Sequence, residues 1–565
     1  MIRNNKFNFQ MGKKKGKKNK SKSKDKMEIE KEEEKEEEEE KPKRKKRKNK
    51  KDKKEPEAKD VTPTVKIVDK KAIVDQYYPD RSQYHIYQDA ENVFNGQFFS
   101  CTLNKSDVGK NNNKFYIIQL LEHDSDNSLV LFTRWGRIGV PGQHDEKDVD
   151  SNSGPRLFMK KYRDKTKGGY QEIFIDYEAE VQKEDLPEEN NSKKDNKKTN
   201  KKKFINTLDE DVMDLIRLIY NKKMINDNLH EIGYDSKKMP LGKLSHVTLT
   251  NGLNILKEIE SELKKSNPDE SNLSELSSNF YTQIPHNFGF QKMSNFIINT
   301  IEKVKEKINM ISSLSDMKIT LKILENADSE SDEYENQEEK QLNDYYKQLN
   351  CDIKTISKDE PIFSTIKKYL TANIIIDDND EYYSYYRRVN NLSLIKAYEI
   401  ERHGEKKKFK DFGNKKLLWH GSRITNFVGI LSQGLRIAPP EAPSSGYLYG
   451  KGVYFADMSQ KSSCYCYPMN DTALILLAEV SLGEEDQRTN CDFNLPITMK
   501  KDSNSVHALG RLEPSEGETI DEDVFVPNGD AKINENISHC NDYAEYIVYN
   551  VDQIKLRYLL KIRYN

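Results

Sequence analysis

The sequence predicts a multidomain α+β protein with a disordered, basic N-terminal tail. The chain has 565 residues, too many for one compact core. Its 33% charged and 35% hydrophobic residues are unevenly spread, so part of the chain lacks the apolar surface needed to fold. Runs typical of strands and of helices occupy different segments of the remainder. These observations divide the chain into a Lys/Glu-rich tail (1–71), a small α+β domain (72–178), a linker (179–203), an all-α bundle (204–325), an acidic linker (326–340) and an antiparallel-rich α+β domain (341–565).

Segregated charge defines the tail. Lys and Arg total 93 and Asp and Glu total 94, so the near-zero net charge conceals blocks of one sign. The tail contains GKKKGKKNKSKSK, then EKEEEKEEEEEK, then PKRKKRKNKKDKK, and such runs bury no apolar surface. One interpretation is a solvated tail without a further role. We favour the other, which is nuclear import combined with salt-dependent attraction to the phosphates of nucleic acid.

Several classes of protein are disfavoured by what the sequence lacks. The six cysteines form no C-x-x-C pair, so neither a zinc module nor a disulfide framework is indicated, and we expect no metal. No apolar run is long enough to predict a membrane span, and we expect no membrane partner. Neither a P-loop nor a G-x-G-x-x-G fingerprint is present, which disfavours hydride transfer on a Rossmann domain.

The small α+β domain carries strand signals followed by a helix signal. Aromatic and β-branched residues predict two strands, at 114–120 and 129–132. The run at 158–162 suggests a helix. The run Trp135-Gly136-Arg137 follows the second strand. An indole and a guanidinium can stack on an unstacked base or sugar, and the family resemblance given below makes Trp135 and Arg137 candidate DNA-binding residues. Alternatively, Trp135 is a core residue.

The next segment has helical periodicity. Thr207 and Glu210 form a capping-box pattern, which predicts that a helix starts at Thr207. Apolar residues recur at helical spacing in three stretches, around 212–219, 249–263 and 299–314. This pattern predicts a helical bundle.

The C-terminal segment reads mainly as strands. A short helix is expected at 426–432, ended by Gly434. The strands are expected at 394–400, 417–420, 474–482, 545–549 and 554–562. This pattern predicts an antiparallel-rich α+β domain.

One part of this segment carries candidate chemistry. Gly421 lacks a side chain, so its backbone N–H and C=O can approach a ligand and hold a carboxamide. Tyr454 and Tyr465 offer flat faces on which a heteroaromatic ring can stack. His420 and Glu545 can bond sugar hydroxyls, and a carboxylate near an anomeric carbon stabilises an oxocarbenium-like transition state. Together these residues describe a pocket for nicotinamide-ribose, although His420 or Tyr454 taken singly is more often structural.

The blocks LLWHGSR, GLRIAPPEAP, GKGVYFADM-x-x-KS and EYIVYN resemble the catalytic domain of the DNA-dependent poly(ADP-ribose) polymerases. The Trp-Gly-Arg block resembles the WGR domain of that family, and MPLGKL and FYTQIPHNFG resemble its helical regulatory domain. The resemblance implies an ADP-ribosyltransferase fold, NAD+ as substrate, recognition of a DNA break, and a bundle that blocks NAD+ until DNA binding loosens it. One departure is Gly168-Gly169-Tyr170, where relatives commonly carry Asn-Asn-Trp.

Carried over position by position, the family's His-Tyr-Glu set is His420, Tyr454 and Glu545, with Lys461 near the acceptor. Glu545 would bond the nicotinamide-ribose, support the oxocarbenium state and orient the incoming hydroxyl. The other roles implied concern NAD+: the Gly421 backbone and Ser462 hydroxyl at the carboxamide, Tyr465 and Tyr454 on the two faces of nicotinamide, His420 and Ser422 at the adenosine ribose, Asn426 and Arg436 at the adenine and phosphate end, and Tyr447 in the wall of the site.

The resemblance therefore implies a nuclear poly(ADP-ribose) polymerase that DNA nicks or breaks stimulate. Its acceptors would be proteins, including itself and chromatin proteins. Two alternatives stay open. One is a mono-ADP-ribosyltransferase with the same activation, since Glu545 permits chain growth without proving it. The other is a catalytically inert DNA-binding scaffold, against which the intact set of His420, Tyr454 and Glu545 argues.

Overall fold

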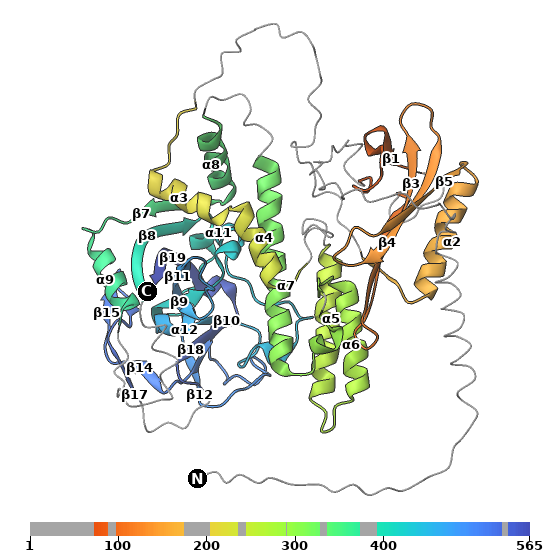
Figure 1. Cartoon of the computed structure of the whole chain (residues 1–565). Helices are drawn as coiled ribbons and strands as arrows, with labels where there is room; N and C mark the ends of the chain where they lie inside the picture. The colour runs from red at the N-terminus through yellow and green to blue at the C-terminus, as the bar shows by residue number, and fades with distance from the viewer. Residues whose placement is uncertain are drawn as a thin grey trace, which may run out of the picture. The chain divides into compact units, whose positions relative to one another are not determined.

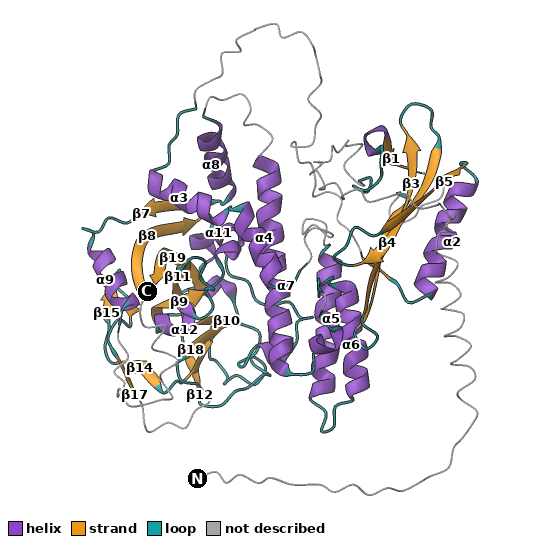
Figure 2. Cartoon of the chain, in the orientation of Figure 1, coloured by secondary structure: helices purple, strands orange, loops and turns teal. Residues whose placement is uncertain are grey.

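The chain folds into two sheet-rich domains with a helical domain between them in the sequence. The predicted tail (1–71) and linker (179–203) lie outside the described residues, and the multidomain α+β class is confirmed for the rest. Strands are concentrated in the first and last domains and helices in the middle one (Figure 2). The computed structural model describes residues 73–88, 98–173, 204–234, 245–289, 291–327, 336–372, 392–533 and 541–565 (Figure 1).

The first domain is an antiparallel sheet with a helix packed on one face. Its strands lie in the order β5-β4-β3-β2-β6, and the short β1 pairs with β3. Phe158 of the helix is fully buried among aliphatic and aromatic side chains of the sheet. The elements are β1 (Tyr84–Ile86), β2 (Ser100–Asp107), β3 (Asn112–His123), β4 (Leu129–Arg137), β5 (Gln143–Val149), α2 (Ser153–Lys167) and β6 (Gln171–Ile173), with the 3₁₀ turn η1 (Arg81–Gln83) before β1.

The helical domain has the expected bundle, and its apolar stripes belong to one buried cluster. Helix α7 extends to Ala327 and the next helix begins at Gln337. Both ends of the predicted acidic linker are therefore helical, and residues 328–335 lie outside the described part of the chain. The helices are α3 (Glu210–Ile219), α4 (Lys222–Glu231), α5 (His246–Leu263), α6 (Glu270–Gln283), α7 (Ile301–Ala327) and α8 (Gln337–Gln348), with the 3₁₀ turn η5 (Met293–Phe296) before α7.

The start of α3 differs from the expected capping box. Asp209, not Thr207, is the N-cap, and its carboxylate accepts a hydrogen bond of 2.8 Å from the Val212 backbone N–H. The Thr207 hydroxyl lies 3.3 Å from the side-chain oxygen of Asn343 on α8. A carboxylate at this position satisfies a free N–H and also interacts favourably with the helix dipole, which explains the shift of two residues.

The C-terminal domain contains a seven-stranded and a four-stranded sheet. The larger has the order β15-β16-β9-β11-β19-β8-β7 and the smaller the order β10-β18-β13-β12, with β14 and β17 as a separate pair. Among the named strands of the described residues, only the pairs β16–β9 and β12–β13 are parallel, which confirms the antiparallel-rich class. The strands are β7 (Cys351–Thr355), β8 (Leu392–Arg402), β9 (Lys415–Gly421), β10 (Val453–Phe455), β11 (Thr472–Ser481), β12 (Glu485–Arg488), β13 (Ser505–Ala508), β14 (Leu512–Pro514), β15 (Glu518–Ile520), β16 (Val524–Val526), β17 (Ala531–Ile533), β18 (Glu545–Val548) and β19 (Ile554–Tyr564).

Short helices and turns connect these strands. The helix expected at 426–432 begins one residue later, because Asn426 ends a 3₁₀ turn. Gly434 ends it with a φ of 82°, a conformation that glycine adopts readily. The elements are α9 (Pro361–Leu370), α10 (Glu405–Lys408), η8 (Ile424–Asn426), α11 (Phe427–Gln433), η9 (Ser444–Gly446), α12 (Ser459–Ser463) and η10 (Val551–Gln553).

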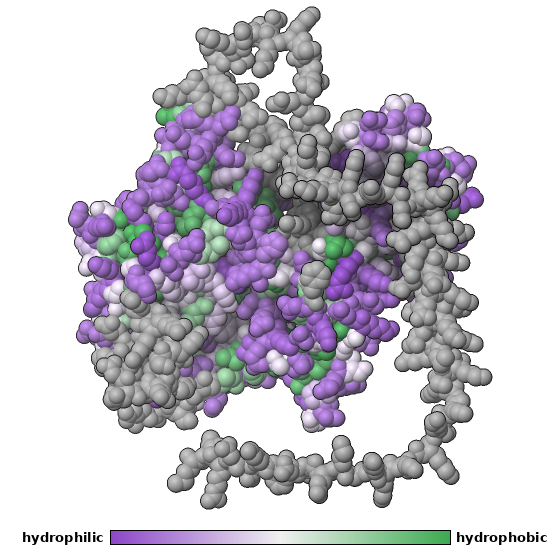
Figure 3. All heavy atoms as spheres, in the orientation of Figure 1, coloured by the Kyte–Doolittle hydropathy of each residue, from purple (hydrophilic) through white to green (hydrophobic). Residues whose placement is uncertain are grey.

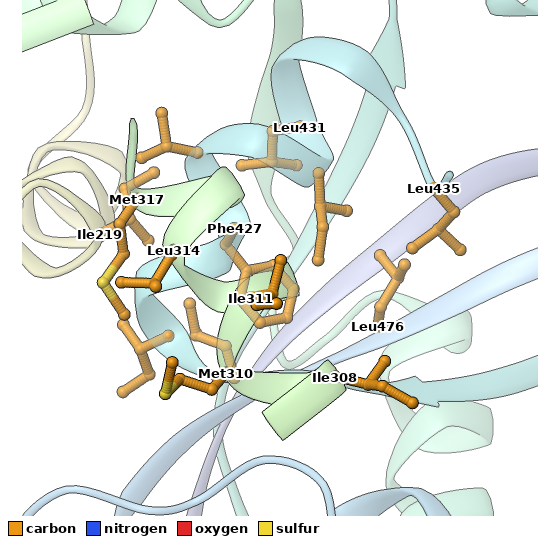
Figure 4. Close-up of a cluster of buried hydrophobic side chains, with 14 of the residues drawn as sticks. Ile219, Ile308, Met310, Ile311, Leu314, Met317, Phe427, Leu431, Leu435 and Leu476 are labelled. Atoms are coloured by element: carbon orange, nitrogen blue, oxygen red, sulfur yellow. The ribbon is translucent and has the colours of Figure 1, made fainter. Parts of the chain in front are cut away.

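Helix α7 shares a buried core with the C-terminal domain. Its apolar side chains pack against the short helix α11 and the large sheet (Figure 4). The shared core contains Ile308, Met310, Ile311, Leu314 and Met317 of α7 together with Phe427, Leu431, Leu435 and Leu476. A helix fixed in this way is part of the domain's structure, so it cannot leave without exposing apolar surface.

The visible surface carries little apolar area. The face in Figure 3 is mainly hydrophilic, with small hydrophobic patches. Across the described residues, no helix combines the length and the hydropathy needed to cross a bilayer.

Glu485, the first residue of β12, offers a test of buried electrostatics. Its carboxylate lies 3.0 Å from Lys416 Nζ and 2.9 Å from His507 Nδ1. Burial raises the pKa of Glu485, but the hydrogen bond and the charges of these two neighbours outweigh it and lower the pKa to about 2. Such a group stabilises the fold above its ordinary pKa of 4.5, and this stabilisation is lost as the pH falls towards 2.

The Glu485→Gln variant should therefore lose about 3 kcal/mol of unfolding free energy at pH 7. The deficit should shrink by pH 3.5, because Glu485 of the unfolded wild-type chain is then largely protonated while that of the folded chain is still ionised, so folding must release a proton. Urea unfolding of both proteins at the two pH values measures the difference. An equal loss of unfolding free energy at both pH values would contradict the lowered pKa of Glu485.

Candidate active site

His420 lies near the end of β9 and is fixed by one hydrogen bond. Its Nδ1–H donates to the Tyr454 carbonyl oxygen at 2.9 Å. Burial lowers the pKa of His420, and the hydrogen bond only partly opposes this shift. The ring is therefore neutral at physiological pH, and its Nε2 is a hydrogen-bond acceptor suited to a sugar hydroxyl.

Gly421 follows directly and lies against the backbone of α12. A Cβ atom at this position would stand 1.8 Å from the Ser462 carbonyl oxygen, so only glycine fits. The Ser462 hydroxyl donates to the Trp419 carbonyl oxygen at 3.0 Å, which fixes the helix to the strand. The structure thus brings together the two residues that the sequence assigned to the carboxamide.

The Tyr454 hydroxyl is occupied within the protein. It donates to the Gly450 carbonyl oxygen at 2.7 Å and accepts from the Tyr449 N–H at 3.0 Å. Only its ring is therefore available to a ligand, as stacking requires. The Tyr447 ring lies 6.3 Å away, centroid to centroid, and Tyr465 is 48% exposed just beyond α12.

Strand register sets the position of Glu545. Tyr454 pairs with Ile547, two residues after Glu545, so Tyr454 and Glu545 point to the same face of the small sheet. Lys461 Nζ lies 2.8 Å from Glu545 Oε1, whereas the buried Oε2 has no hydrogen-bond partner among the described residues. Burial lowers the pKa of Lys461, but the Glu545 carboxylate outweighs this effect and the net shift is upward. The pair therefore presents one satisfied and one free carboxylate oxygen.

Ser422 and Asn426 contact each other on the loop after β9. The Asn426 side-chain N–H donates to the Ser422 hydroxyl at 3.0 Å. The side-chain oxygen of Asn426 is buried and has no partner within the described part of the chain. A free buried acceptor favours a ligand that carries hydrogen-bond donors, as an adenine amine or a ribose hydroxyl does.

Arg436 is engaged by the helical domain. Its guanidinium forms an ion pair with the Asp316 carboxylate of α7. Asp316 is 8% exposed, and burial raises its pKa to about 6 although the Arg436 charge opposes this. Sequence reasoning did not identify Asp316. The available signal was an acidic residue within the apolar stripe between Leu314 and Met317.

The predicted DNA-binding residues lie in strand β4, not after it. The Trp135 ring stacks on Tyr116, with centroids 5.7 Å apart and planes 15° apart. Lys165 Nζ of α2 lies over the Tyr116 ring, 4.4 Å from the ring centroid. The Arg137 guanidinium donates to the Asn111 carbonyl oxygen at 2.8 Å. Trp135 is therefore half-buried in a layer of aromatic and basic groups, and both the core and the binding interpretations keep their support.

The site consists of polar organic groups. Within the described ranges, no group of three or more His, Cys, Asp or Glu side chains could hold a metal ion. The arrangement offers a glycine backbone, aromatic faces, a neutral imidazole and a carboxylate. These groups suit binding of a nicotinamide riboside and stabilisation of positive charge at its anomeric carbon.

Known proteins match most of the chain. Family models match the chain in three segments: the WGR domain at 99–175, the poly(ADP-ribose) polymerase regulatory domain at 206–360, and the poly(ADP-ribose) polymerase catalytic domain at 379–564. Poly [ADP-ribose] polymerase 2-A of Oryza sativa subsp. japonica is 38% identical over 515 residues, which cover 87% of this chain and 74% of the relative. Poly [ADP-ribose] polymerase 2 of Homo sapiens is 34% identical over 511 residues, 85% of this chain and 81% of the relative. Poly [ADP-ribose] polymerase 1 of Gallus gallus is 34% identical over 490 residues, 85% of this chain and 46% of the relative.

The fold and the matches together define an NAD+-dependent ADP-ribosyltransferase. The prediction of an enzyme that uses NAD+ as substrate is confirmed. More particularly, the chain belongs to the poly(ADP-ribose) polymerase family, with the WGR, regulatory and catalytic domains that the sequence blocks predicted.

Proposed function

We propose that this polymerase is stimulated by DNA nicks or breaks and acts in the nucleus on protein acceptors, including itself and chromatin proteins. The observation that carries the catalytic part is the Lys461–Glu545 pair with its free carboxylate oxygen, on the same sheet face as Tyr454. NAD+ is the substrate and no metal is required.

We assign the residue roles as the resemblance implies, and this geometry supports them. The carboxamide lies on the Gly421 backbone and the Ser462 hydroxyl, with nicotinamide between Tyr454 and Tyr465. The bond from C1 of the ribose to the nicotinamide nitrogen breaks, and nicotinamide leaves with the bonding electrons. Glu545 Oε2 accepts a hydrogen bond from the ribose and stabilises the oxocarbenium charge.

The acceptor completes the transfer. Glu545 orients an acceptor hydroxyl, which attacks C1 of the ribose and releases its proton to water. Lys461 holds the other carboxylate oxygen, so Glu545 keeps one orientation throughout. If the acceptor is a previous ADP-ribose, the chain grows.

The helical domain restrains this site at its adenosine end. Asp316 of α7 pairs with Arg436, a residue assigned to the adenine and phosphate end of NAD+. A second contact lies beside Ser422: Arg423 donates to Glu231 at 2.7 Å and to Asn228 at 2.8 Å, both on α4. These contacts support autoinhibition, because NAD+ must compete with α7 for Arg436.

The WGR domain contacts the same helical domain. Asn104 donates to the Thr282 carbonyl oxygen at 2.8 Å, and the Ser106 N–H donates to the Thr282 hydroxyl at 2.9 Å. Asn113 donates to the His286 carbonyl oxygen at 2.9 Å. These hydrogen bonds would transmit a change in the WGR domain on DNA binding to Thr282 and His286, in the segment that leads into α7.

Weakening the α4 contact should raise basal activity. Glu231 is largely exposed and its ion pair with Arg423 is worth less than about 1 kcal/mol, so Glu231→Gln should raise DNA-free turnover about two- to fivefold. Glu338→Gln is a matched control, because it breaks an exposed pair with Arg217 inside the helical domain at 2.8 Å. Nicotinamide release without DNA measures both. Equal effects of the two changes would contradict a specific restraint.

One experiment tests the proposed function. Nicotinamide release from labelled NAD+ is measured with and without nicked DNA, beside a gel for product size. DNA-stimulated release with a ladder is expected. Release without a ladder would support the mono-ADP-ribosyltransferase alternative, and unchanged release on adding DNA would overturn the proposed trigger.

A further inference from the structure

A buried polar cluster lies behind the catalytic strand β18. Tyr546 follows Glu545, and successive strand residues face opposite ways, so the Tyr546 side chain is on the face away from Glu545. The Tyr546 hydroxyl donates to Asp457 Oδ2 at 3.2 Å. Tyr546 is 4% exposed and Asp457 is 3% exposed. Nothing in the proposed mechanism uses either residue.

Burying the Asp457 carboxylate costs folding free energy. Burial raises its pKa to about 6, against the opposing effects of His507, of the Tyr546 hydrogen bond and of Lys416. Its second oxygen, Oδ1, is buried without a hydrogen-bond partner among the described residues. A buried carboxylate with one hydrogen bond gives little net stability, so its presence points to a role other than stabilising the fold.

The Tyr546 ring is held on several sides. The His507 ring stacks on it with centroids 4.2 Å apart, and Lys416 Nζ lies 4.6 Å from its centroid. Glu485 binds both of these cationic or polar groups, at 3.0 Å to Lys416 and 2.9 Å to His507. The hydroxyl therefore has a fixed direction toward Asp457.

Asp457 lies at the entrance to α12. It comes directly before Met458, the N-cap of the helix that carries Lys461. Lys461 in turn pairs with Glu545 at 2.8 Å. These contacts form a closed circuit. Glu545 is followed in the chain by Tyr546, whose hydroxyl donates to Asp457. Asp457 precedes α12, and Lys461 of α12 pairs with Glu545.

We propose that Asp457 and Tyr546 are positioning residues that fix α12 against β18 and so hold Lys461 and Glu545 in their catalytic arrangement. One hydrogen bond on the buried face sets the geometry of an ion pair on the substrate face. This inference rests on the active site proposed above.

Three variants test the circuit. Tyr546→Phe and Asp457→Leu each remove the hydrogen bond, and Asp457→Asn keeps an oxygen that can accept it. Tyr220→Phe is the control, since its buried hydroxyl donates at 3.2 Å to the Tyr345 carbonyl oxygen within the helical domain, away from the circuit. The assay is nicotinamide release by the full chain with nicked DNA, with kcat and KM for NAD+ measured separately, beside thermal unfolding.

Tyr546→Phe and Asp457→Leu should each lower kcat about tenfold and change KM less than about twofold, because misplacing a catalytic group slows chemistry more than binding. The double variant should be no slower than either single one, and Asp457→Asn should be near wild type. Tyr220→Phe should lower the unfolding temperature without changing kcat.

Three outcomes would overturn the proposal. The first is a Tyr546→Phe variant with wild-type kcat and only a lower unfolding temperature. The second is independent, multiplying effects in the double variant. The third is Asp457→Asn as slow as Asp457→Leu. If wild type itself released no nicotinamide, the proposed function would fail instead, and the two failures are thus distinguishable.

Discussion

The Glu545→Gln variant is expected to form no ADP-ribose chains and to release nicotinamide roughly a hundredfold more slowly than wild type. Gln keeps the volume of the side chain but removes the charge that stabilises the oxocarbenium state. It also leaves the half-buried Lys461 ammonium without its carboxylate. The loss should therefore appear in kcat more than in KM for NAD+.

The measurement pairs a kinetic assay with a gel. Glu513→Gln is the control, because Glu513 is a half-exposed Glu of the same domain that pairs loosely with Lys532 at 3.9 Å. It should make chains of wild-type length. A normal ladder from Glu545→Gln would show that the free carboxylate oxygen has no part in chain growth.

A second large loss is expected for Gly421→Ala. The new methyl carbon would lie 1.8 Å from the Ser462 carbonyl oxygen and 2.7 Å from its carbon, both backbone atoms that cannot move aside alone. Either α12 shifts or β9 does, and each carries residues assigned to NAD+. A displacement near 1 Å should lower kcat/KM by roughly a hundredfold.

Gly109→Ala is the control for this change. A Cβ there would meet only Asp107 Oδ1 at 3.5 Å and Ser274 Oγ at 3.8 Å, ordinary contact distances. Turnover and binding of an NAD+ analogue by calorimetry should distinguish the two variants. Gly421→Ala with normal binding and turnover would mean that the carboxamide lies elsewhere.

Local pattern predicted much of this architecture because periodicity and glycine placement are local properties. The strand ending in His420, the helix ended by Gly434 and the strand beginning at Glu545 all form near the expected residues. Thr207 was a wrong helix cap, because a nearby carboxylate at Asp209 competed for the same N–H groups. The structure places His420 on β9, Tyr454 on β10, Lys461 on α12 and Glu545 on β18, whereas the roles of these residues towards NAD+ stay predictions.

The rest depended on contacts between distant segments, which no local pattern contains. The pairing of Arg436 with Asp316 spans 120 residues, and the contact of Tyr546 with Asp457 spans 89. Nor does sequence indicate that the Tyr454 hydroxyl is occupied by Gly450. Each of these needs the fold before it can be seen.

The core that α7 shares with the catalytic domain limits how activation can occur. Five of its apolar side chains are at most 3% exposed there, and burying each is worth roughly 1.5–3 kcal/mol. Withdrawing the whole helix would thus cost about 8–15 kcal/mol. Recognition of a specific DNA feature typically supplies about 4–10 kcal/mol over non-specific binding. The upper part of the energy available from DNA only reaches the lower part of the cost of withdrawal. If a DNA break is the trigger, as proposed above, loosening a turn or two near Asp316 is therefore favoured over detaching the helix, and α7 should remain mostly docked while the enzyme works.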